Sequence, residues 1–158
     1  ETVWANMTTK TPSALEDHAG YWLRYVSNHV SHAFARKVEA QGVTVAEWVL
    51  LRQMFGAGAA NPSQLADAVG MTRGAVSKLV ERLSRKKLAV RSSSERDRRY
   101  QTVELTEAGQ RLAPILAQLA DENDREFFGH LEPHERTKLV NLLQDIVRRH
   151  GWKDLPVN

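Results

Sequence analysis

Residues 61–87, NPSQLADAVGMTRGAVSKLVERLSRKK, predict two short helices, each with its own start signal. Asn61 precedes Pro62, and a capping side chain followed by proline at the first helical position is typical of a helix start. The first helix should stop at Gly70, a residue suited to the left-handed conformation past a helix end. Thr72 then caps the second helix. Only a tight turn fits between the two helices, and this strongly limits the folds that the chain can adopt.

Helical patterns flank this pair on both sides. Thr44 and Glu47 have the spacing of a capping box, in which the two side chains satisfy backbone N–H groups at a helix start. Thr106 precedes a stripe of apolar residues at helical spacing, and so predicts another cap. Further helices are expected at residues 13–40, 44–55 and 106–128, and from residue 133 onward.

Between these helices the apolar period changes from helical to alternating. LAVR (88–91) and TVEL (102–105) are short alternating stretches on either side of a charged segment, which predicts a two-stranded ribbon with a long tip. The order helix, tight turn, helix, ribbon is that of a winged helix-turn-helix. The expected fold class is therefore mainly α with a small β-hairpin wing.

Basic residues gather in the same part of the chain. Residues 72–99 hold ten Lys or Arg against three acids, a local charge of +7 in a chain whose total is +3. Such a block inside an otherwise mildly acidic chain is typical of a protein that binds a polyanion. A well-solvated surface rich in Lys and Arg is the alternative interpretation of the charge alone.

The start of the second short helix has features that suit contact with DNA. Gly74 lies inside the predicted helix, where glycine costs about 1 kcal/mol relative to alanine. Close approach to a groove would explain it, and a neutral packing choice is the alternative. Free N–H groups at the helix start can meet a phosphate, while Arg73 and Lys78 are candidates for base-edge or phosphate contacts.

LADAVGMTRGAVSKLVERLSRKKLAVRSSSERDRRYQTVELTEAG, residues 65–109, resembles the MarR family of transcriptional regulators. The most specific part is D-x-R followed by V-x-L-T-x-x-G, and the chain departs from the family at Lys87, where glycine is usual. The resemblance implies a homodimer with interlocking terminal helices that binds double-stranded DNA, with Asp97 orienting Arg99 for the minor groove. The candidate DNA-binding residues are Ser63, Thr72, Arg73, Gly74, Ala75, Ser77, Lys78, Arg82, Arg96, Asp97, Arg98 and Arg99.

The resemblance also suggests how the chain divides. We expect a tail at 1–12, an N-terminal dimerisation helix at 13–42, the winged helix-turn-helix DNA-binding domain at 43–109, and C-terminal dimerisation helices at 110–158. Leu139, Leu142, Leu143 and Ile146 have the spacing to bury one face of the last helix. The lysine in place of glycine at position 87 should cost roughly 1 kcal/mol at a left-handed turn.

Aromatic residues and histidines gather on the first helix. Family members of this type often respond to small aromatic acids, and rings with one cation would suit an aromatic or phenolic carboxylate. The alternative, which we favour, is that these rings form the core of a dimer interface. Histidine spacing allows a metal site, but nothing else in the pattern supports one. The candidate ligand residues are Tyr21, Trp22, Tyr25, His29, Trp48 and Arg52.

Several classes of function are disfavoured. The chain has no cysteine, which excludes disulfides and thiol chemistry. No phosphate loop, G-x-S-x-G or H-E-x-x-H occurs, so we expect neither an enzyme nor a cofactor. Without a leader pattern or a long apolar run we expect the cytoplasm. A ligand-released repressor is the leading hypothesis; an architectural DNA-binding protein and a protein-interaction module are its rivals.

Overall fold

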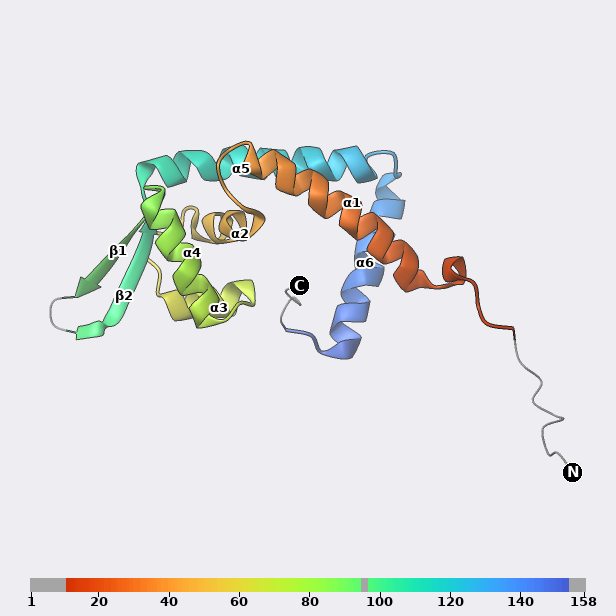
Figure 1. Cartoon of the computed structure of the whole chain (residues 1–158), viewed down its shortest axis with the longest axis horizontal. Helices are drawn as coiled ribbons and strands as arrows, with labels where there is room; N and C mark the ends of the chain where they lie inside the picture. The colour runs from red at the N-terminus through yellow and green to blue at the C-terminus, as the bar shows by residue number, and fades with distance from the viewer. Residues whose placement is uncertain (1–10, 95–96, 154–158) are drawn as a thin grey trace, which may run out of the picture.

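Six α-helices and one β-ribbon make up the part of the chain that the computed structural model describes, residues 11–94 and 97–153 (Figure 1). Of residue 94 and residues 97–100 it describes only the strand backbone. The mainly α fold with a small hairpin is as predicted. The elements are a 3₁₀ turn η1 (Leu15–Asp17), α1 (Ala19–Glu39), α2 (Val45–Met54), α3 (Pro62–Val69), α4 (Arg73–Arg85), β1 (Ala89–Ser94), β2 (Asp97–Leu105), α5 (Glu107–Phe128) and α6 (Pro133–His150).

The four predicted helix caps are confirmed. Thr44 Oγ1 accepts from the backbone N–H of Glu47 at 3.2 Å, and Asn61 Oδ1 accepts from that of Ser63 at 2.8 Å. The other two caps are equally local: Thr72 accepts from Ala75 N at 3.1 Å, and Thr106 accepts from Gly109 N at 3.2 Å. Each cap satisfies a donor that the helix itself leaves free, so these side chains set where the helices begin.

The first helix begins later than predicted. The expected start was residue 13, but α1 starts at Ala19, after the separate turn η1. The backbone N–H of Ala14 donates to Asp17 Oδ2 at 2.9 Å, which closes a tight local turn. His18 is then extended, with φ −97° and ψ 123°, and this interrupts the helical path. The aspartate competes for backbone donors, a known reason for short polar side chains to favour turns over helix interiors.

The hydrophobic core lies beneath α5, where α2, α4 and the ribbon meet. Leu50, Leu51 and Met54 of α2 are fully buried, as are Val76, Val80 and Leu83 of α4. Leu65 and Ala66 of α3 and Leu116 of α5 complete the same cluster. The apolar stripe predicted for α4 therefore faces the core as expected. Burial of this stripe leaves the opposite, polar face of α4 exposed to solvent.

The ribbon is longer than predicted. The two antiparallel strands extend to Ser94 and Asp97, which are paired across the ribbon, so residues 92–94 belong to β1 rather than to a long tip. Backbone pairing continues through this serine-rich stretch, whose composition gives little sign of a strand. Ala60 adds a third pairing: its N–H and C=O both bond to Val103 at 2.8 Å. This bridge ties the loop before α3 to the ribbon.

The turn from α4 into β1 is locked to the start of α5. Lys87 has φ 59°, the left-handed value expected from its position, and no other non-glycine residue among those described has a positive φ. Its carbonyl accepts from Thr106 Oγ1 at 2.7 Å, and the Leu88 carbonyl accepts from Thr106 N at 3.0 Å. A Cβ on Gly109 would overlap the Leu88 carbonyl oxygen. In the T-x-x-G motif, the threonine therefore hydrogen-bonds this turn and the glycine lets the turn pack closely against α5.

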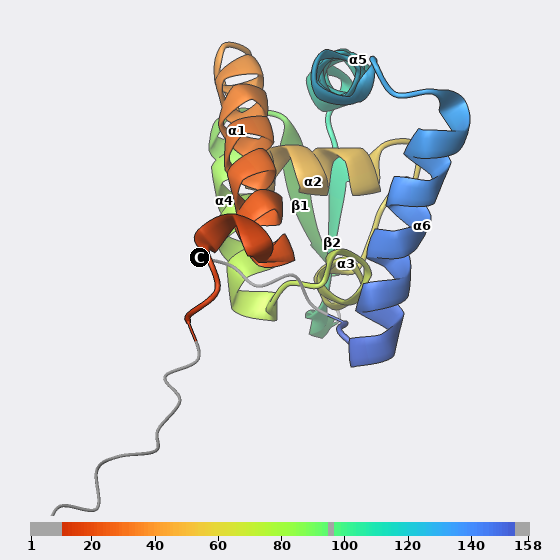
Figure 2. The ribbon, with the colours of Figure 1, turned by 90° about the vertical axis from the view of Figure 1, so that its right-hand side faces the viewer.

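Helix α6 buries none of its residues within the single chain. It descends from the far end of α5, and when the molecule is seen along α5 it stands on the side opposite α1 (Figures 1 and 2). Leu142, which was expected to be buried, is 55% exposed, and Leu143 and Ile146 are also exposed. Apolar residues of the N-terminal half of α1 are equally uncovered. No helix among the described residues is long and apolar enough to cross a membrane.

Candidate nucleic-acid interface

The exposed face of α4 carries most of the predicted DNA-binding residues. Arg73, Ser77, Lys78 and Arg82 are all exposed on α4, opposite the buried stripe that anchors it. Thr72 and Gly74 are exposed at its first turn, Ala75 is half-buried there, and Ser63 is half-buried at the start of α3. The fold therefore brings the helical part of the predicted site together on one surface.

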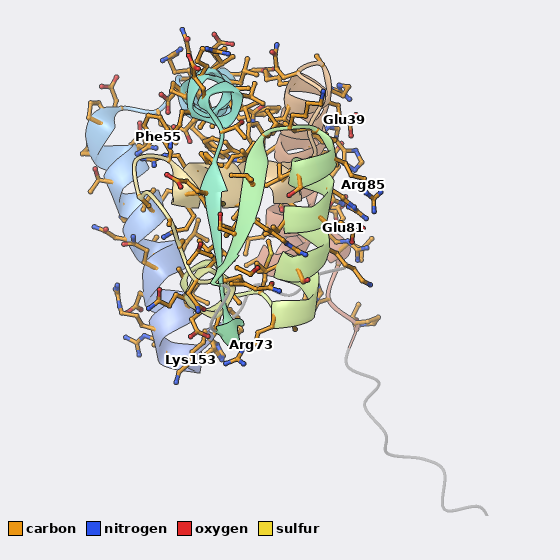
Figure 3. All side chains as sticks on the ribbon, turned by 90° about the vertical axis from the view of Figure 1, so that its left-hand side faces the viewer. Glu39, Phe55, Arg73, Glu81, Arg85 and Lys153 are labelled. Carbon is orange, nitrogen blue, oxygen red and sulfur yellow. The ribbon has the colours of Figure 1, made fainter. Side chains whose placement is uncertain are left out.

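The ribbon reaches the same edge of the molecule as the start of α4. Arg73 marks that start (Figure 3), and the ribbon diverges from α4 as it descends and reaches the same lower edge of the molecule to one side of it (Figure 1). A recognition helix and an adjacent wing could thus meet successive grooves of one duplex. The predicted Arg96 lies outside the described residues. Asp97, Arg98 and Arg99 are placed in β2 by their backbone, but their side chains also lie outside the described part.

Gly74 occupies open space. A Cβ built on it would meet no atom within 4 Å, so nothing in the described part of the chain requires glycine there. Its backbone is helical and not left-handed, which removes the conformational reason as well. Any requirement for glycine at this position therefore comes from outside the described part of the chain. Close approach of a DNA backbone to the first turn of α4 would impose one.

Two basic side chains on and beside α4 are held by partners that sequence reasoning missed. Arg91 of β1 donates through Nη2 to the Ser77 carbonyl at 2.8 Å and to Ser77 Oγ at 3.2 Å. Arg85 pairs with Glu81 at 2.6 Å. The hydrogen bond from Arg85, together with its charge, lowers the pKa of Glu81 below its usual value. The carboxylate therefore stays ionised and partly neutralises this end of the face.

An ion pair between a buried carboxylate and a partly exposed lysine supports the far end of α4. Glu47 is 1% exposed, and its two carboxylate oxygens accept from Lys86 Nζ at 3.0 and 2.8 Å. The same ammonium donates to the carbonyl of Gly42 at 2.9 Å. Lys86 thus joins the end of α4 to α2 and to the turn that precedes it. Sequence reasoning assigned Glu47 only to a helix cap, and its position among apolar neighbours was the one signal of burial.

The predicted ligand residues do not line one pocket in the single chain. Trp22 lines a groove of about 500 Å³ formed by α1, α5 and α6, whereas Arg52 lines a hollow of about 280 Å³ between α2 and α5. Tyr25 stacks on His29 with ring centroids 5.2 Å apart, and both are exposed. Trp48 packs edge-on against Phe34 of α1, and Tyr21 lies edge-on to Trp22. Within residues 11–94 and 97–153, no three His, Asp or Glu side chains are grouped to hold a metal ion.

Two short capped helices, a tight turn, an exposed basic helix face and an adjacent ribbon define a winged helix-turn-helix protein. The model of the MarR family matches residues 41–99, a segment that contains α2, α3, α4 and β1 and ends in the first residues of β2. This match, together with the similarity to the regulators described below, supports a MarR family winged helix-turn-helix regulator. The chain is thus a DNA-binding regulator, and the relatives that it matches are regulators rather than enzymes.

The similarity extends over most of the chain. A putative transcriptional regulatory protein for the hcr operon of Thauera aromatica is 29% identical over 140 residues, which cover 88% of this chain and 83% of that protein. The transcriptional repressor NicR of Pseudomonas putida is 26% identical, covering 87% of each. Among solved structures, BpsR of Bordetella bronchiseptica, whose DNA binding is regulated by 6-hydroxynicotinic acid, superposes with a TM-score of 0.76 at 27% identity, covering 87% of this chain and 99% of that one.

Proposed function

We propose that the protein is a sequence-specific repressor that binds a pseudo-palindromic operator as a homodimer and is released by a small aromatic acid. The observation that carries DNA recognition is the shared edge formed by the start of α4 and the end of the ribbon. Arg73, Ser77 and Lys78 are exposed on α4 beside that edge. Repression is supported by NicR, which is named a repressor.

The uncovered apolar face of the terminal helices supports the homodimer. Leu142, Leu143, Ile146 and Val147 of α6 are all exposed in the single chain. A second copy would cover them, and a two-fold axis would set two winged domains on successive half-sites. In this proposal residues 43–109 form the DNA-binding domain, while residues 13–42 and 110–158 form the dimerisation region.

A small aromatic acid is the effector that fits the chemistry of the candidate ligand residues. Arg52 can pair with a carboxylate, and Tyr25, His29 and Trp48 offer aromatic surface. BpsR, which is regulated by 6-hydroxynicotinic acid, is the similar structure that supports this class. Since Trp22 and Arg52 line separate hollows in one chain, the proposal requires the second copy to complete the site.

The proposal is tested by competition between DNA sequences. Purified protein is titrated into a labelled duplex from the region upstream of its own gene, against an unlabelled scrambled duplex of the same composition. We expect a preference of at least a thousandfold at physiological salt. Equal affinity for the two duplexes would favour an architectural protein. Addition of 6-hydroxynicotinic acid should then dissociate the protein from the specific duplex. If the complex persists, this compound is excluded as the effector.

Arg99→Ala tests the wing. Loss of a cation from the minor groove should weaken binding to every duplex by a similar factor. It should also reduce the slope of log affinity against log salt by about one. Sedimentation should show an unchanged dimer. Lys138→Ala on α6, which also removes one exposed charge, is the matched control and should leave the slope unaltered. Unchanged DNA binding in Arg99→Ala would remove Arg99 from the interface.

A further inference from the structure

Arg91 joins the ribbon to the recognition helix. It lies on β1, and its Nη2 donates to two acceptors of the same residue, the Ser77 carbonyl at 2.8 Å and the Ser77 hydroxyl at 3.2 Å. Among the described residues, these are the side-chain hydrogen bonds that link the two strands to α4. Because a charged donor holds two points of the helix, the ribbon cannot slide along α4 without breaking them.

The contact also orients the Ser77 hydroxyl. One lone pair of Oγ accepts from Arg91, so the O–H bond must point away from the guanidinium. Ser77 is exposed on α4, and its hydroxyl donates to none of the described residues. The arrangement therefore presents an outward hydrogen-bond donor near the first turn of the recognition helix.

Arg91 is free for this role because the neighbouring carboxylate is already paired. Glu81 lies one helical turn beyond Ser77, where it could compete for the guanidinium, but its Oε1 accepts from Arg85 at 2.6 Å. The chain thus has two arginines near α4 with different attachments. One is paired with a carboxylate, and the other is bonded to the backbone and hydroxyl of a helical residue.

We propose that Arg91 is a positioning residue that sets sequence specificity, by fixing the ribbon on α4 and presenting Ser77 as a donor to one base pair. An outward donor favours base edges that present an acceptor in the major groove over the cytosine edge. Guanine N7 and O6, adenine N7 and thymine O4 accept a hydrogen bond, whereas the cytosine and adenine amino groups cannot. The inference rests on the proposed sequence-specific binding.

The experiment begins with selection of duplexes from a random pool by the wild-type protein, then by Arg91→Lys and Ser77→Ala. Arg91→Lys keeps the charge but removes the guanidinium geometry. We expect both variants to lose the preference at the same base-pair position. Arg91→Lys should bind the wild-type selected duplex about tenfold more weakly, yet bind a scrambled duplex with unchanged affinity and salt slope. Arg85→Lys is the matched control and should keep the wild-type preference.

Non-additivity provides the second readout. In the Ser77→Ala background Arg91→Lys should cost clearly less than the tenfold expected alone, because the oriented donor is already absent. A full additive loss, or retention of the wild-type preference by Arg91→Lys, would overturn the proposal. A salt slope lower by about one in Arg91→Gln, which removes the charge, would make Arg91 a direct phosphate contact instead. If the wild-type protein enriches no sequence, the proposed function itself fails, and this inference fails with it.

Discussion

Residues 43–109 bury most of their apolar side chains within one chain, whereas α6 buries none of its residues. In the winged domain, local caps, the Ala60–Val103 bridge and the Glu47–Lys86 pair hold each element against another. Helix α6 has a cap and an apolar face but no core of its own chain to meet. The difference supports the proposed homodimer, in which each copy forms its own DNA-contacting surface and α6 packs against the second copy.

Truncation of one leucine in each region should give the largest contrast. Leu83 is fully buried in α4, and Leu83→Ala should lower the free energy of unfolding by about 2–5 kcal/mol at any protein concentration. Leu142→Ala should lower it only where the protein is dimeric, so its effect should vanish on dilution. Urea unfolding at several protein concentrations checks both. A concentration-independent loss in Leu142→Ala would show that α6 packs within its own chain.

The two ion pairs at the end of α4 should differ in how much stability is lost when each is broken, with the larger loss at the buried carboxylate. Lys86→Met leaves the buried Glu47 carboxylate without its cation and should cost about 2–3 kcal/mol, somewhat less than for pairs in which both groups are buried. Arg85→Met breaks an exposed pair on the neighbouring residue and should cost well under 1 kcal/mol. The midpoint of urea unfolding measures each. Equal costs would mean that the Lys86 contact does not organise the domain.

Two glycines near helix starts offer a smaller, matched test. Gly109→Ala forces a Cβ onto the Leu88 carbonyl and should destabilise the fold by about 1–3 kcal/mol. Gly74→Ala meets open space and should leave stability unchanged or raise it by up to about 1 kcal/mol. The same Gly74→Ala protein should bind its own upstream DNA more weakly. Wild-type affinity in that variant would leave Gly74 without a role at the interface.

Local signals in the sequence predicted much of the winged domain. Thr72 and Asn61 act within three residues of their own position, so their caps can be recognised without the fold. The left-handed turn at Lys87 was predicted from the family resemblance, because glycine is usual at that position. The family match then agrees with the order of helices and ribbon.

Contacts between residues that are distant in sequence could not be predicted from such local signals. Lys86 is 39 residues from Glu47, and Arg91 is 14 residues from Ser77. Each basic residue has several acceptors of suitable chemistry nearby in sequence, so only the packed structure selects the partner. The ribbon was underestimated for a related reason, because cross-strand pairing, rather than the propensity of the serines, extends β1 to Ser94.

The central claim is that one copy completes the winged domain while DNA binding requires two. Leu142→Asp places a charge on the exposed face of α6, and Gln144→Asp, also on α6 and exposed, is its matched control. Sedimentation, circular dichroism and DNA titration should be run on the same samples. We expect Leu142→Asp to be monomeric, still helical, and at least a hundredfold weaker for the upstream duplex, since both half-sites no longer bind together. A monomer that binds this DNA with wild-type affinity would contradict the account.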